Sequence, residues 1–171
     1  DQVLVLREAV LDYLTHIGRS ELSDTEAAEY VRLVAATGEI ETMSTSISRE
    51  LAPLARALTD AQITPSKDSA ELLQRLLQTT QEAAQAALRA LVDSDERAAQ
   101  SVVAKRGAIL DLMADLQRLQ ASRLAQDDPQ RLIKHRLQLE IVDRLRRIHA
   151  LAEHMALSVL PRSVLAGELA A

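Results

Sequence analysis

The chain contains no Cys, Trp or Phe, and only two Tyr, four Gly and four Pro among its 171 residues. The absence of Cys excludes a disulfide scaffold, a thiolate metal site and a Cys nucleophile. The scarcity of aromatic side chains, together with a net charge of −5, argues against nucleic-acid binding. No apolar run approaches the roughly 18–20 residues of a membrane span, and no signal-peptide pattern is present.

Leu and Ala are abundant and together make up a third of the chain. Strong helix formers combined with few turn residues and few β-branched or aromatic residues predict an all-α protein. The length is sufficient for one domain or for two small repeats with a buried core.

Five helical segments are predicted, joined by short connections. The first covers residues 2–18, and the others begin at helix-capping patterns. These patterns are the capping box Ser23–Glu26, Thr64 as N-cap followed by Pro65, Asp93 as a cap with Glu96 at the third helical position, and Asp128 followed by Pro129. The fourth segment is expected to end near Ala125 and the last at Pro161. Pro53 falls late in the second segment and is expected to kink it.

Each segment carries a wide apolar stripe with steps of three or four residues. Such stripes and short connections predict an antiparallel up-and-down helix bundle. When the second segment is shifted onto the last by 108 positions, apolar residues coincide. The matched pairs are Leu33 with Ile141, Val34 with Val142, Thr37 with Leu145, Ile40 with Ile148, Met43 with Leu151, Ile47 with Met155, and Leu51 with Val159. We interpret the chain as two three-helix repeats, the first lacking its opening helix.

The second unit resembles the second half of a PhoU-like domain, and is most similar to the cytoplasmic domain of bacterial sodium/phosphate cotransporter-family proteins. The stretches that carry the likeness are 71–76, 87–95, 96–125, 126–130 and 139–149 followed by Leu160 and Pro161, with 21–34 in the first unit. The resemblance implies two PhoU-like three-helix repeats. The first, truncated repeat covers residues 1–60 and the second 67–161, with a linker at 61–66 and a tail at 162–171.

PhoU proteins carry an acidic signature, with Glu and Asp four residues apart, on the long helix of each repeat. Here the matching positions are Gly38 and Thr42, then Arg146 and Ala150, so both ligand positions are lost in both copies. The carry-over of metal binding therefore fails, and we expect no catalytic, cofactor-binding or metal-binding residue.

Other candidate sites are weaker. Glu41, His149 and Glu153 could rebuild a metal site from neighbouring positions, although a surface His–Glu pair is the simpler interpretation. The acidic pairs Asp111/Asp115 and Glu140/Asp143 are better explained by surface pairing than by a cation site. Hydroxyls of the run 44–46 are expected to bond back to preceding carbonyls. No nucleophile elbow or glycine-rich phosphate loop is present, so an enzyme is not expected.

Charge is distributed unevenly along the chain. Residues 1–65 carry 11 acids and 5 bases, whereas residues 66–171 carry 14 acids and 15 bases. The last helix is rich in basic residues, namely Arg131, Lys134, Arg136, Arg144, Arg146 and Arg147. This basic face either docks on a partner or an anionic lipid surface, or is a solvated face balanced by the acidic first unit.

The resemblance implies a non-catalytic regulatory domain on the cytoplasmic side of the cell membrane, in a sodium/phosphate symporter-like protein. Its expected partners are the transmembrane portion of the same polypeptide and a second copy of itself, with no direct membrane insertion. Because the chain opens at Asp1 inside a helical pattern, we expect it to be a piece of a longer polypeptide, and its first unit to expose an apolar face. The alternatives are a stand-alone PhoU-type phosphate-signalling regulator that binds iron or zinc, and a structural or membrane-surface helical bundle.

Overall fold

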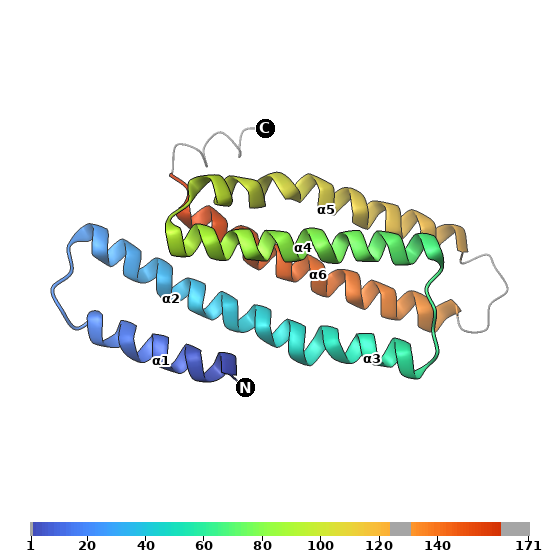
Figure 1. Ribbon diagram of the computed structural model, residues 1–171, viewed down its shortest axis with the longest axis horizontal. Coiled ribbons are helices and arrows are strands. Elements are labelled where there is room, and N and C mark those ends of the chain that lie inside the picture. Colours follow the sequence, from blue (N-terminus) through green and yellow to red (C-terminus); the bar gives the residue numbers. More distant parts are fainter. Residues whose placement is uncertain (1, 124–130, 162–171) are drawn as a thin grey trace.

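The computed structural model describes residues 2–123 and 131–161, and every regular element in this part is helical (Figure 1). The elements are α1 (Gln2–Ile17), α2 (Asp24–Thr45), the π-helical η1 (Ser46–Leu51), α3 (Ala52–Asp60), α4 (Lys67–Asp93), α5 (Glu96–Arg123) and α6 (Arg131–Val159). Because α2, η1 and α3 follow one another without interruption, they form the single long second segment expected from the sequence. The predicted all-α bundle is confirmed. The predicted cap at Asp128 and the tail at 162–171 lie outside the described residues.

The start of α2 is fixed by the predicted capping box. The Ser23 hydroxyl accepts from the Glu26 amide, and the Glu26 carboxylate accepts from the Ser23 amide at 2.9 Å and from its hydroxyl at 2.7 Å. The Ser23 hydroxyl and amide hold the pKa of Glu26 below its usual value. This reciprocal bonding satisfies amide donors that the first helical turn leaves free.

Two predicted caps were placed wrongly by a few residues. The N-cap of α4 is Ser66, not Thr64, because the Ser66 hydroxyl accepts from the Ser69 amide while Pro65 lies outside the helix. The N-cap of α5 is Asp95, not Asp93. Its carboxylate accepts from the amides of Arg97 and Ala98 at 2.9 and 3.1 Å. Asp93 instead ends α4, since Ser94 takes a left-handed conformation with φ of 50° and turns the chain.

The distortion expected at Pro53 takes the form of the π-helical segment η1, which lies directly before it. Proline has no amide hydrogen, and its ring clashes with the carbonyl four residues earlier in a regular α-helix. A wider π turn accommodates that crowding without ending the helix. The long segment therefore runs through Pro53 into α3.

Helices α4, α5 and α6 pack on one another along their lengths, and the hairpin of α1 and α2 lies beside them (Figure 1). Helix α2 and its continuation run antiparallel to α6, since Glu39 pairs with His154 while Glu50 pairs with Arg144. One core cluster gathers Leu76 with buried residues of α5 and α6. The other joins Ala36 and Met43 of α2 to the small side chains of α4 and to α6.

Across residues 2–123 and 131–161, no helix combines the length and the apolar character needed to cross a bilayer.

Candidate functional site

The three residues that could rebuild a metal site point to different partners. Glu41 on α2 forms an ion pair with Arg7 on α1, with 2.7 Å between the Glu41 Oε2 and Arg7 Nε atoms. Glu153 on α6 faces Arg106 on α5, at 3.7 Å. Within the described ranges, no three or more His, Asp or Glu side chains are grouped so that they could hold a metal ion.

His149 is the most deeply buried of the titratable groups singled out from the sequence, with 4% of its surface exposed. It hydrogen-bonds the backbone of Val102 on α5, and its Nε2 atom has no hydrogen-bond partner in the described part of the molecule. Burial lowers the pKa of His149, although Glu153 and the bond to Val102 act in the opposite direction. The side chain is therefore a neutral packing element between α5 and α6.

The predicted acidic pairs are used in local ion pairs along their own helices. Asp115 pairs with Arg118, and Glu140 pairs with Arg136 at 3.6 Å. Asp111 is exposed. The two pairs do not combine into a carboxylate cluster in the described structure.

The back-bonding expected of the hydroxyl run 44–46 is wrong at Ser46, which is 1% exposed and whose hydroxyl has no hydrogen-bond partner among the described residues. Hydroxyls on either side of the run do bond back, because Thr42 and Ser48 donate to the carbonyls four residues earlier, each at 2.8 Å. Ser46 begins the π-helical segment, where the regular pattern of back-bonding changes.

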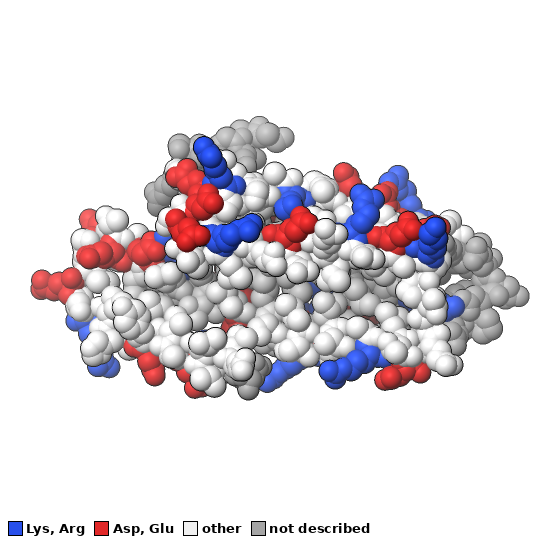
Figure 2. All heavy atoms as spheres, viewed as in Figure 1, with Lys and Arg blue, Asp and Glu red and all other residues white. Residues whose placement is uncertain are grey.

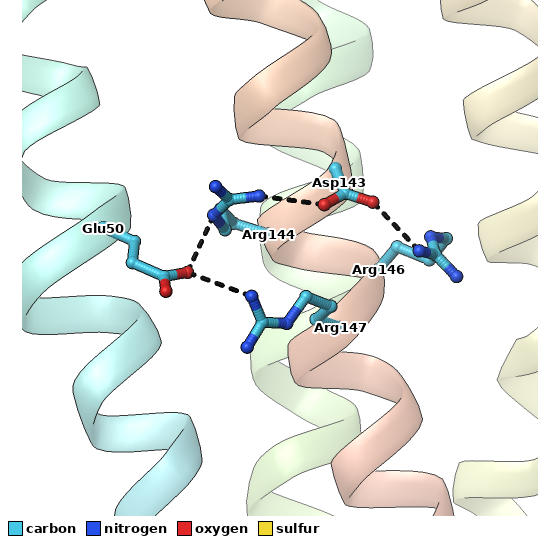
Figure 3. A network of polar contacts seen from close by, with 5 residues as sticks. All are labelled: Glu50, Asp143, Arg144, Arg146 and Arg147. Atoms are coloured by element: carbon cyan, nitrogen blue, oxygen red, sulfur yellow. Dashed lines mark hydrogen bonds and ion pairs between the residues drawn. The ribbon is translucent and has the colours of Figure 1, made fainter.

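Three of the basic residues of α6, namely Arg144, Arg146 and Arg147, pair with acidic residues inside the molecule (Figure 3). Glu50 of η1 forms an ion pair with Arg144, with 2.7 Å between Oε2 and Nε, and accepts a hydrogen bond from Arg147 at 3.4 Å. Asp143 pairs with Arg144 and with Arg146, each at 2.9 Å, and the Arg146 hydrogen bond in particular lowers its pKa. These contacts favour the interpretation of a balanced face over that of an open anion-binding surface. They also tie α6 to the first half of the chain.

Two apolar hollows lie along the long helix formed by α2, η1 and α3. The first, of about 360 Å³, lies between α1 and α2 and is lined by residues that include Leu14, Ile17, Leu22, Tyr30 and Leu33. The second, of about 390 Å³, lies between η1, α3, α4 and α6. Its lining residues include Ile47, Leu51, Leu73, Leu77 and Ile141.

Four positions of α2 and η1 that belong to the matched apolar pattern are only partly buried. We call this set the α2 stripe and define it by Val34, Thr37, Ile40 and Ile47, of which Ile40 packs against the core cluster and Ile47 lines the second hollow. Val34 is 36% exposed and Ile47 is 48% exposed, while Thr37 and Ile40 are half-buried.

The positions of α6 matched to the α2 stripe by the 108-residue offset are all buried. Their exposures are 6% for Val142, 2% for Leu145, 4% for Ile148 and 1% for Met155. These side chains are covered because Leu76 and the Ala-rich stretch of α4 pack against α6. Two helix stripes with the same apolar pattern thus differ in how deeply they are buried.

In comparisons with known proteins, no family model matches the chain, and neither a curated protein nor a solved structure matches it.

Sequence reasoning did not find the two hollows, and it offered the balance of α6 by the acidic first unit as one of two alternatives without naming the pairs. A stripe of apolar residues marks the face that a helix buries, but it does not reveal whether a partner helix is present. The excess of acid in the first 65 residues was the one available signal for the pairing of Glu50 with α6.

Proposed function

We propose that this chain is a non-catalytic, PhoU-like regulatory and interaction domain of a sodium/phosphate transporter-like membrane protein, on its cytoplasmic side. The observation that carries the proposal is the antiparallel packing of two long helices with matched apolar patterns, α2–α3 and α6, each accompanied by a further helix. That arrangement fits two related three-helix units, of which the first has two helices in this chain.

The contacts between the long helices support an approximate two-fold relation. At the offset of 108 residues, Glu39 corresponds to Arg147, and Ser46 corresponds to His154. A two-fold relation that pairs Glu39 with His154 would also pair Arg147 with Ser46. Glu39 does contact His154, and Arg147 contacts Glu50, which lies one helical turn after Ser46. Met43 and Leu151, which also correspond, belong to one core cluster.

The replaced acidic signature supports a role in binding rather than in metal chemistry. At the signature positions, Gly38 and Thr42 provide no carboxylate, and Arg146 pairs with Asp143. A domain of this kind acts through a binding equilibrium between helical faces, which biases a partner toward one of its states.

The test begins with the reading frame that encodes this chain. We expect several membrane-spanning segments upstream of Asp1 in the same polypeptide. Cells that express this polypeptide should then take up labelled phosphate in a sodium-dependent manner. Removal of residues 1–161 should change the uptake rate, or its response to internal phosphate, by at least twofold at equal surface expression.

A reading frame without upstream membrane spans would refute the transporter assignment. Equal uptake with and without residues 1–161, over the full range of phosphate concentrations, would refute the regulatory role.

A further inference from the structure

We propose that the second hollow, between η1, α3, α4 and α6, is a binding site for an uncharged, mostly apolar small molecule with the bulk of two to three aromatic rings. The proposal goes beyond the interaction role proposed above and does not depend on the transporter assignment. It rests on the composition of the lining, on the volume of the hollow, and on its position between the two halves of the chain.

The lining of the second hollow is almost entirely apolar. Of the nine described residues that line it, eight are Leu, Ile or Ala, and the ninth is Gln74. Water in such a hollow finds few hydrogen-bond partners, so an apolar molecule displaces it favourably. The first hollow differs, since Thr25, Glu26 and Glu29 contribute to its wall. The second hollow is therefore the better candidate for an apolar ligand.

The second hollow reaches from the core to the surface. Leu145 of α6 is 2% exposed, whereas Ile47 of η1 and Leu77 of α4 are 48% and 47% exposed. On the α3 side, the wall is made of the small residues Ala52 and Ala55, which leave the space unfilled. A ligand in the hollow would cover the exposed parts of Ile47 and Leu77, and this burial of apolar surface would favour binding.

The volume of the second hollow sets the size of the ligand. At about 390 Å³, it falls within the range of about 300–1,000 Å³ that is usual for small-molecule sites, which also occur between the helices of bundles. An apolar cavity of about 150 Å³ is sufficient for benzene. The hollow therefore accepts a molecule of two to three rings, and it is too small for a helix.

The charges near the hollow argue against an ionised ligand. No charged side chain is among its described lining residues. The neighbours Glu50 and Arg144 pair with each other at 2.7 Å (Figure 3). An unpaired charge is costly to transfer into apolar surroundings. The exposed amide of Gln74 can donate and accept, so it suits one hydroxyl or carbonyl group of the ligand.

The surface around the hollow is also poor in charge. In Figure 2, charged side chains gather in a band over α4 and α5 and along the lower edge of the molecule. The surface between them, which includes the region between α4 and α3, is mostly uncharged. An approaching ligand therefore meets little competition from solvated ions, and its affinity should depend weakly on salt.

The hollow connects the two halves of the chain. Its wall takes Ile47 and Leu51 from η1 in the first half, and Leu73 and Ile141 from α4 and α6 in the second. A ligand bound there contacts all three segments, and it binds only while they are packed together. Binding should therefore stabilise the attachment of the first half to the second. In the interaction domain proposed above, such a ligand would be an effector.

The experiment compares two fluorescent probes on the whole 171-residue chain. N-phenyl-1-naphthylamine is uncharged, and 1-anilinonaphthalene-8-sulfonate has the same rings with one added sulfonate. Fluorescence titration should show saturable binding of the uncharged probe at one site, with at least tenfold higher affinity than the sulfonated probe. Because the ligand binds the folded state, a saturating concentration should raise the midpoint of thermal unfolding by about 5 °C.

Substitutions on α3 locate the binding site. Ala55→Leu extends a side chain into the hollow and should weaken binding of the uncharged probe at least tenfold. Ala57→Leu is the matched control, because Ala57 is exposed on the same helix but does not line the hollow. It makes the same chemical change and should alter the affinity less than twofold. Both replaced residues are exposed, so the variants are expected to fold, and circular dichroism checks this.

Four results would overturn the inference. They are the absence of saturable binding of the uncharged probe, equal affinity of the two probes, equal effects of Ala55→Leu and Ala57→Leu, and loss of self-association in Ala55→Leu when the parent chain binds no probe. The last would assign the hollow to a contact between two copies. These results leave the transporter assignment untouched, because that assignment is tested separately by the reading frame and by phosphate uptake.

Discussion

The two halves of this molecule differ in how completely they bury matched apolar patterns. In the second half, α4, α5 and α6 enclose their stripes, and α4 alone contributes eight buried residues. In the first half, Leu14 is the one buried residue of α1 and Ala36 and Met43 are those of α2. The comparison shows that two helices with matched apolar stripes can bury them to different depths.

Ion pairs occur both within the second half and between the halves. The pairs within the second half, such as Lys105 with Glu82 at 2.9 Å, connect helices that share a core. Glu39 and Glu50 connect α2 and η1 to α6, beside the apolar contacts that Met43 and Leu51 make with the core clusters. Polar and apolar contacts thus both attach the first half to the second.

The largest expected effect comes from the same substitution at two matched positions. Ile148→Ala removes a side chain buried in the main core and should lower the free energy of unfolding by about 3–4 kcal/mol. Ile40→Ala removes a half-buried side chain and should cost about 1–2 kcal/mol. Urea denaturation followed by circular dichroism measures both values. Equal costs would show that the first half is as well packed as the second.

A second prediction concerns pH and another matched pair, His149 and Glu41. Because burial lowers the pKa of His149, its folded form binds protons less readily than its unfolded form. Stability should therefore be highest above the unperturbed value of about 6.5 and decline as the pH falls through and below it.

His149→Gln keeps a donor for the Val102 carbonyl and should flatten this decline between pH 7 and 5. Glu41→Gln, at the matched and partly exposed position, should not flatten it. Thermal melts across this pH range make the comparison, and an unchanged slope in His149→Gln would contradict it.

The smallest effect is expected at the link between the halves. Glu50→Gln removes the charge shared by Arg144 and Arg147, whose side chains are partly exposed, so the cost should be about 0.5–1 kcal/mol. Glu82→Gln in the second half is the control for a more exposed pair and should cost less. If added salt abolishes the difference between these variants, screened charge is its source. A Glu50→Gln cost of zero at low salt would show that the link contributes nothing.

Much of the fold followed from local patterns in the sequence. The box at Ser23 sets the start of α2, and the stripes predicted the helices that the structure contains. Local patterns failed at the caps of α4 and α5, because Ser66 and Asp95 compete with nearby residues of similar chemistry. The backbone decides between the candidate caps. At α5, for example, the left-handed turn at Ser94 ends α4 and leaves Asp95 as the cap.

The partial exposure of the α2 stripe could not have been predicted from its apolar pattern alone. Ile40 and Ile148 occupy matched positions in the sequence, and only the arrangement of helices shows that one is buried and the other is partly exposed. Likewise, the pairing of Arg147 with Glu50 spans the two halves and leaves no signal in local spacing. Long-range packing determined both features.

The most direct test of the account is native-state hydrogen exchange of the backbone amides, measured on the whole chain at several low urea concentrations. We predict that amides of α1 and of residues 24–40 exchange through local opening, at a lower free energy than global unfolding, whereas those of α4 and α6 exchange only on global unfolding. Uniform protection across both sets would contradict the claim that the first half is incompletely covered.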